Sequence, residues 1–329
     1  MFSPETFSLF NLPDKALKHV ARCLDSVEIF CLSIVTERTK QLIKSLNIPD
    51  GRFVLEICND VSIVVLVLRP LEIRWNYDDP ESLSIHTSGE DFRDIRPRKL
   101  TKEGFHLGDW IRHLISIFNQ EDVKRILLRS IPETVIPKPF FDSITGIDIR
   151  ILVVFNRNVE HTTKDYRSLL PYVKHLCISR RSSENCESIQ EVIIQNYDYL
   201  SVHVDIRLSL DHYLLMNSSY IGMQDEMSQS KVNRFIRHWI QGSNPRLKVL
   251  DYWSNGIPKL QKILKRITHQ DVSDNQVRTF EIRDLAPSRE KDIIVNSGYN
   301  IRRVDGTQAT IHIRVFPPIG FRLFLLVWN

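Results

Sequence analysis

The chain has 329 residues, of which 42% are hydrophobic and 26% are charged, a composition typical of soluble globular proteins with one large domain or two. Its 44 lysine and arginine residues nearly balance 40 aspartate and glutamate residues, so the net charge of +4 is too small to indicate a nucleic-acid-binding protein. The five cysteines are widely spaced and include no C-x-x-C pair, which argues against a disulfide scaffold and against a zinc site.

The segment 1–48 predicts three short helices. Pro13 stands where a helix can begin, because a backbone N–H is not needed in the first turn. Apolar residues follow at the i, i+3, i+4, i+7 spacing of one helical face: Leu17, Val20, Ala21 and Leu24. Ser26 is the predicted N-cap of a second helix, and a third helix begins at about Thr36. Turn-forming residues at 47–51 predict the end of this module.

The next segment has the residue pattern of strands. An alternating strand at 53–57 and a β-branched strand at 61–68 are separated by the turn residues Asn59 and Asp60. This arrangement predicts a β-hairpin. Residues 76–102 are polar, and we expect them to be irregular.

From residue 107 onward, short apolar strands recur. Their central residues are Leu127, Leu152, Leu176, Val202 and Leu250. The first three intervals are nearly equal and the last is about twice as long, so one repeat is expected around 216–227, although it lacks a clear pattern. Several of the strands follow a helix-like segment. Because leucine-rich-repeat proteins place one strand and one helix in about 20–29 residues, we predict a degenerate α/β solenoid. The alternative is an ordinary α/β domain whose strands happen to be evenly spaced.

The sequence contains none of the P-loop, dinucleotide-binding, nucleophile-elbow or zinc-protease motifs. Its eleven histidines are irregularly spaced, and a lone one on a strand, such as His203, is expected to be structural. Basic runs at 96–99, 180–181 and 302–303 indicate either a nuclear signal or phosphate-binding patch, or solvated loops, which we favour. Trp239 lies at helical spacing from Phe235, so we expect it in the core with a partner for its indole N–H.

The N-terminal module carries more apolar surface than it can bury alone, since three helices in about 45 residues form a very small core. Its large apolar residues are Phe7, Leu9, Phe10, Leu12, Leu17, Val20, Leu24, Ile29, Phe30, Leu32, Ile34 and Val35. Exposed apolar patches usually mark interfaces, so part of this surface is expected to meet another protein. The alternative is that all of it packs on the C-terminal domain.

The module also resembles a known family. The pattern from Phe7 to Leu24, with its Leu12-Pro13 pair, followed by Ile29-x-x-Leu32-Ser33-x-Val35-Thr36, resembles the F-box. Further motifs are similar to the type-2 F-box-associated domain of the nematode-expanded F-box family, and they lie at 231–253, 301–310 and 321–328. Together the motifs cover nearly the whole chain.

The resemblance implies a substrate-recognition subunit of an SCF-type cullin–RING ubiquitin ligase, which bridges a Skp-type adaptor and a protein target. Carried over by position, the adaptor-binding residues are Leu9, Leu12, Pro13, Leu17, Val20, Leu32 and Val35. The ubiquitin-transfer chemistry belongs to other subunits, so no catalytic residue, cofactor or metal is expected here. The expected location is the cytoplasm, the nucleus or both, without a membrane or nucleic-acid partner. The residues that bind the target are not predicted.

We therefore predict an α/β (α+β) fold, with an F-box at 1–48 and an F-box-associated substrate-recognition domain at 49–329. This second domain is expected to be strand-rich at 52–75 and to contain irregular repeats from about 107. Three alternatives remain: an interaction scaffold without a ligase, a nucleic-acid-associated protein that uses the arginine clusters, and an enzyme of an unfamiliar type.

Overall fold

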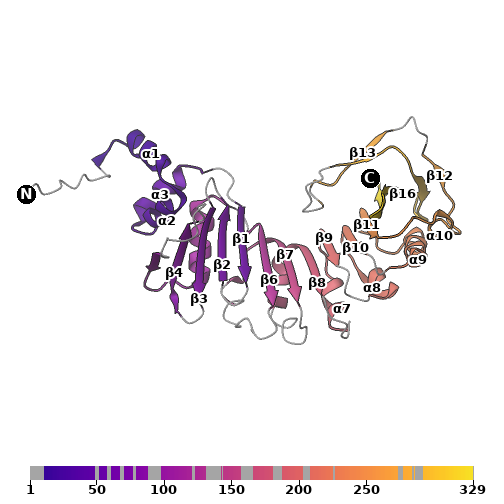
Figure 1. The fold of residues 1–329 in the computed structure, drawn as a ribbon, viewed down its shortest axis with the longest axis horizontal. Coiled ribbons are helices and arrows are strands. Elements are labelled where there is room, and N and C mark those ends of the chain that lie inside the picture. Colours follow the sequence, from indigo (N-terminus) through magenta and orange to yellow (C-terminus); the bar gives the residue numbers. More distant parts are fainter. Residues whose placement is uncertain are drawn as a thin grey trace, which may run out of the picture. The chain divides into compact units, whose positions relative to one another are not determined.

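The structure is a computed structural model (Figure 1), and it describes residues 11–48, 52–57, 61–66, 70–76, 79–87, 98–120, 123–130, 142, 144–156, 166–180, 187–202, 208–224, 227–272, 277–283, 285 and 292–328. The chain divides into two compact units. The N-terminal unit comprises residues 1–126 and 137–148, and the C-terminal unit comprises residues 127–136 and 149–329. The boundary predicted from the sequence, between residues 48 and 49, separates two sequence modules and not these two compact units, and it stays a prediction.

The three predicted N-terminal helices are present as α1 (Asp14–Cys23), α2 (Ser26–Ser33) and α3 (Glu37–Ser45). Helix α3 begins directly after its N-cap Thr36, which confirms the predicted start at about this residue. The prediction for α2 was wrong by one residue, because Asp25 and not Ser26 is the N-cap. The Asp25 carboxylate accepts from the Glu28 N–H at 2.8 Å, and the Glu28 carboxylate accepts from the Asp25 N–H at 2.9 Å. This reciprocal pair satisfies two backbone donors at once, and Ser26 has no acidic residue three positions later to match it.

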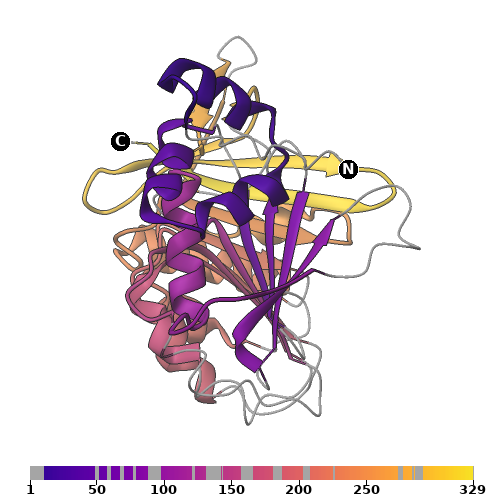
Figure 2. The ribbon, with the colours of Figure 1, turned by 90° about the vertical axis from the view of Figure 1, so that its left-hand side faces the viewer.

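An antiparallel sheet follows in the N-terminal unit, in the order β1-β2-β3-β4-β5. Its strands are β1 (Arg52–Ile57), β2 (Val61–Leu66), β3 (Pro70–Asn76), β4 (Asp79–Thr87) and β5 (Arg98–Thr101). The predicted pairing of β1 with β2 is confirmed, and its turn residues lie outside the described residues. Helix α4 (Leu107–Ile117) runs beside this sheet (Figure 2).

The prediction that 76–102 is irregular was wrong, because β4 and β5 lie within it. Leu83 and Ile85 in β4 are buried, and they pair with Trp75 and Ile73 of β3. Two alternating apolar residues are too few to reveal a strand in the sequence. Cross-strand pairs between large apolar side chains stabilise the strand once β3 is present.

The C-terminal unit contains the repeating strands. They are β7 (Ile149–Asn156), β8 (Val173–Arg180), β9 (Tyr199–Val202), β10 (Tyr220–Gln224) and β11 (Val249–Ser254). They lie side by side in this order, and each neighbouring pair is parallel. The connecting helices are η2 (Tyr166–Tyr172), α7 (Glu187–Ile193), α8 (Leu210–Leu215) and α9 (Gln229–Ile240). Strand β6 (Arg125–Ser130) is divided between the units.

One fully buried residue from each parallel strand forms a continuous row that we call the aliphatic ladder. Its members are Leu152, Leu176, Leu200, Ile221 and Leu250. The rung on β10 is the repeat that the sequence pattern did not reveal. It was hidden by Gly222, where a Cβ atom would come within 2.9 Å of the Ser201 hydroxyl oxygen on the neighbouring strand. The mixed α/β fold is thus confirmed, and the likeness to leucine-rich-repeat proteins stays a prediction.

Antiparallel strands extend the sheet beyond β11, in the order β17 (Gly320–Val327), β16 (Gln308–Phe316), β15 (Tyr299–Arg302) and β12 (Gln270–Asp271). Most of β17 is buried. A separate pair, β13 (Arg278–Glu281) and β14 (Asp292–Val295), covers this part of the sheet through one apolar cluster. Beneath it, the Asp251 carboxylate accepts from the Tyr220 hydroxyl at 2.6 Å and from two Arg322 nitrogens at 2.7 Å.

Candidate functional site

The candidate site is built on the N-terminal helices, and helix α1 supplies its first part. Leu17 and Ala21 bury one row of α1. The next row is formed by residues spaced four apart, which share one side of a helix. On α1 itself, Ala16 is half-buried and Val20 is 37% exposed, and Leu12 and Leu24, which flank the helix at its two ends, are half-buried. Helix α1 therefore presents a partly uncovered apolar row beside its buried one.

The turn between α2 and α3 supplies the second part. Leu32, near the end of α2, is half-buried, and Val35, directly before the cap of α3, is 67% exposed. In contrast, Ile29 and Phe30 of the same helix are buried. A large apolar side chain at this exposure gains nothing from its own fold, so Val35 is available for contact with another protein.

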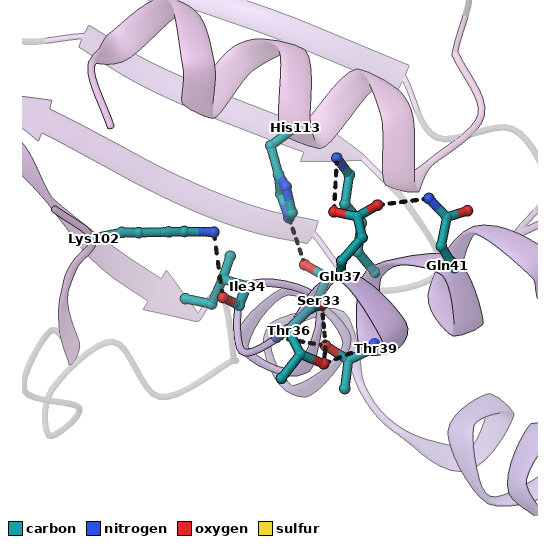
Figure 3. A network of polar contacts seen from close by, with 9 residues as sticks. Ser33, Ile34, Thr36, Glu37, Thr39, Gln41, Lys102 and His113 are labelled. Atoms are coloured by element: carbon teal, nitrogen blue, oxygen red, sulfur yellow. Dashed lines mark hydrogen bonds and ion pairs between the residues drawn. The ribbon is translucent and has the colours of Figure 1, made fainter. Parts of the chain in front are cut away.

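Hydrogen bonds hold this turn against the rest of the N-terminal unit (Figure 3). His113 of α4 points toward Ser33, and its Nε2 lies 2.8 Å from the Ser33 hydroxyl oxygen. The same hydroxyl donates to the Phe30 carbonyl at 2.6 Å, so its oxygen accepts from the His113 N–H. The Lys102 ammonium donates to the Ile34 carbonyl at 3.4 Å.

The first turn of α3 is fixed in the same way. The Thr36 hydroxyl oxygen accepts from the Thr39 N–H at 3.1 Å, and the Thr39 hydroxyl oxygen accepts from the Thr36 N–H at 3.0 Å. Glu37 then accepts from the Gln41 amide at 2.7 Å (Figure 3). At the other end of α3, the Asn119 amide donates to the Lys44 carbonyl at 3.0 Å. Both ends of α3 are therefore held, which positions Val35 on a defined backbone.

An aromatic cluster lies beneath the turn. The Phe30 ring is 6.1 Å from the Trp110 ring and 6.3 Å from the His113 ring, measured between centroids, and Phe105 lies 4.7 Å from Trp110. Phe30 and Trp110 are fully buried. Rings at these separations contribute packing energy beyond their buried area. The α2–α3 turn thus rests on a rigid apolar base.

Burial controls the charge state of His113. Desolvation, followed by the positive charges of Lys40 and Lys102, lowers the pKa of this imidazole from 6.5 to about 4, and the Glu37 carboxylate partly opposes this shift. The ring is therefore neutral at pH 7. A neutral ring carries one N–H, and the geometry assigns this N–H to the Ser33 hydroxyl oxygen.

The seven residues predicted for this surface have different surroundings. Pro13, Val20 and Val35 are exposed, and Leu12 and Leu32 are half-buried. Leu17 is only 4% exposed, so its side chain packs within the protein. Leu9 lies outside the described residues.

Comparison with known proteins gives matches in both parts of the chain. A family model described as the F-box domain matches residues 9–50, which contain α1, α2 and α3, and a model described as F-box associated matches residues 188–252. The chain therefore contains an F-box and an F-box-associated domain. The "F-box associated domain-containing protein sdz-33" of Caenorhabditis elegans is 26% identical to this chain over 309 residues, which are 93% of each chain. No solved structure matches.

The F-box-associated match runs from α7 through β11, and it therefore contains three rungs of the aliphatic ladder together with α9. The sequence motif at 301–310 lies outside this match. No helix in the described ranges is long and apolar enough to cross a membrane.

The sequence did not reveal the residues that hold the F-box turn from outside the F-box. Lys102 and His113 lie 68 and 80 residues from their partners Ile34 and Ser33. The available signal was indirect: His113 stands among the apolar residues of the helix predicted from residue 107. A histidine in that setting needs a hydrogen-bond partner, but the sequence does not identify it.

Proposed function

We propose that this F-box protein is a non-catalytic substrate receptor of an SCF-type cullin–RING ubiquitin ligase. Its F-box binds a Skp-type adaptor, and its F-box-associated domain holds a protein target. The observation that carries the proposal is the exposure of Val35 on a turn that hydrogen bonds hold in place, inside the segment that matches the F-box.

The adaptor contact is proposed to use the exposed and half-buried apolar residues of this surface: Leu12, Pro13, Val20, Leu32 and Val35. Leu9 is assigned to the same contact by sequence position. Leu17 supports α1 from within, because its side chain is already buried. The sequence modules are proposed to be the F-box at 1–48 and the substrate-recognition domain at 49–329.

The proposed mechanism is positioning. The receptor holds a target near the ubiquitin-carrying subunits, which raises the effective concentration of the target's lysines at the site of transfer. No catalytic residue of the receptor takes part, and the protein acts in the cytoplasm, the nucleus or both.

The test is co-expression with a Skp-type adaptor, followed by co-purification and measurement of Kd. Val35→Asp is expected to weaken the complex at least about tenfold, because burying a valine contributes about 1.5–3 kcal/mol and a buried carboxylate adds a cost. Leu12→Asp is expected to act in the same direction.

Val304→Asp is the matched control. It changes the same residue type at 65% exposure in the C-terminal unit and is expected to leave the complex unchanged. If the adaptor does not co-purify with the unchanged chain, or if Val35→Asp and Val304→Asp bind equally well, the receptor proposal is wrong. The protein would then be an interaction scaffold without a ligase.

A further inference from the structure

The C-terminal unit contains a hollow of about 430 Å³ whose walls are rich in arginine. Helix α9 supplies Arg234 and Arg237, the segment after α10 (Leu260–Ile263) supplies Arg266 and Ile267, and the end of β15 supplies Arg302. We call this hollow the arginine pocket. Its four guanidinium groups come from three separate elements, so the fold brings them together.

The positive charges of the arginine pocket are not neutralised within the described part of the chain. None of its four arginines forms an ion pair with a carboxylate there, and no aspartate or glutamate lines the pocket. A second hollow, of about 860 Å³, differs because Asp198 lies among its basic residues Arg246 and Lys248. The chain as a whole has nearly as many acidic as basic residues, so an unpaired group of four arginines points to an anionic ligand.

Buried polar groups hold the segment that carries Arg266. The Asn233 side chain is 5% exposed, and its amide donates to the carbonyls of Ile263 at 2.7 Å and Lys265 at 2.9 Å. Arg266 follows directly, with a φ of 57°, in the left-handed region that is costly for residues other than glycine. A strained arginine at the edge of a pocket is an arrangement found at ligand-binding sites.

The segment that carries Arg302 is held as well. The neighbouring Arg303 is 8% exposed, donates to the Gly242 carbonyl, and lies over the Trp239 ring with its guanidinium carbon 5.5 Å from the ring centroid. The Val304 N–H donates to the Ile240 carbonyl at 2.9 Å. The sequence-based expectation that residues 302–303 form a solvated loop is therefore wrong for Arg303. Arg302 is left facing the pocket on a fixed strand end.

The dipole of helix α9 explains the position of only one of these arginines. Arg237 lies in the last turn of α9, where the free carbonyl groups favour cations without any ligand. Arg266 and Arg302 belong to other elements, so this explanation does not extend to them. Their convergence on the same hollow needs a different cause.

We propose that the arginine pocket binds a phosphorylated serine or threonine of the target protein, an inference that rests on the proposed receptor function. Guanidinium groups match phosphate oxygens with paired hydrogen bonds. The hollow is confined to about 430 Å³, and among the described residues that line it the only ring is that of His238, with no phenylalanine, tyrosine or tryptophan for base stacking. The half-buried Ile240 and the buried Ile267 line the hollow as well, so part of its wall is apolar.

The experiment uses the full chain and fluorescence anisotropy. The probes are a degenerate peptide pool with a central phosphoserine or phosphothreonine, the same pool without phosphate, and a DNA duplex. The phosphorylated pool is expected to bind at least about tenfold more tightly than the other two probes. Arg237→Gln and Arg266→Asn are each expected to weaken this binding about tenfold, and asparagine is chosen because it tolerates a positive φ.

Lys231→Gln is the matched control, because Lys231 is exposed on the same helix outside the pocket. It is expected to bind like the unchanged protein, and all variants are expected to keep its thermal unfolding transition. Equal binding of both peptide pools, no binding, tighter binding to the duplex, or unchanged binding in both arginine variants would each overturn the proposal.

Adaptor capture separates this outcome from that of the receptor proposal. If the chain captures the adaptor but binds the two peptide pools equally well, only the proposed role of the arginine pocket is refuted. A chain that binds phosphopeptides but never captures the adaptor refutes the receptor function and leaves the pocket as a phosphate site.

Discussion

Acidification should weaken the attachment of the F-box helices through one residue, His113. The unfolded chain binds a proton at this histidine near its ordinary pKa of 6.5, whereas burial in the folded protein lowers the pKa to about 4. Between these values the unfolded state binds more protons, so stability is complete above pH 6.5 and falls as the pH drops toward 4. At about 1.4 kcal/mol for each pKa unit, the full loss is about 3 kcal/mol.

The test compares the unchanged protein with His113→Gln, whose amide can still donate to Ser33 but does not titrate. Hydrogen exchange of peptides from α2 and α4, corrected for intrinsic exchange rates, measures the free energy of opening from about pH 7.5 to about pH 4.5. Carboxylates elsewhere in the chain titrate in both proteins. The difference between the two curves of opening free energy against pH therefore isolates the contribution of His113. Parallel curves over this range would refute the assignment of a neutral, buried imidazole.

Four further substitutions, one of them a matched control, test the fold by urea unfolding. Asp25→Ala removes the reciprocal cap of α2 and should cost about 1 kcal/mol, and a change below about 0.3 kcal/mol would contradict the capping role. Gly320→Ala should cost more than about 2 kcal/mol, because φ is 150° and the new Cβ would collide with the Ser254 carbonyl, whereas Gly306→Ala meets no atom within 4 Å and should cost less. Asp251→Asn should cost about 3 kcal/mol, because it removes the charge that the buried Tyr220 and the half-buried Arg322 share, and a neutral result would show that these contacts contribute nothing.

The F-box helices were predictable because their signals are local. Pro13 and Thr36 mark helix starts through their own backbone chemistry, and such signals need no knowledge of the rest of the chain. The shift of one cap from Ser26 to Asp25 follows the same logic, because Glu28 three residues later decides which cap is reciprocal. A search for that pair would have found it.

The parallel repeat was predictable from its intervals, although not from each strand. The doubled interval between Val202 and Leu250 predicts one further strand, and β10 fills it at Ile221. The strand itself was not predicted from the sequence, because its backbone comes so close to Ser201 that position 222 has to be a glycine. Glycine weakens the usual sequence signature of a strand.

Contacts between distant segments were not predictable. The expected hydrogen-bond partner for the Trp239 indole is an example, because this nitrogen has no acceptor among the described residues and the ring contacts Arg303 instead. The arginine pocket is another, since its residues are spread from 234 to 302 and meet only in the folded chain. Sequence spacing carries no information about such convergence.

The aliphatic ladder has a consequence for how such a domain can diversify. The length of chain between successive rungs varies, being shortest between Leu200 and Ile221 and longest between Ile221 and Leu250. All five side chains nevertheless meet in one buried row. Insertions and deletions in the intervening segments therefore leave the row intact, at an entropic cost that grows only slowly with length. Related proteins can change these connections while keeping the same interior.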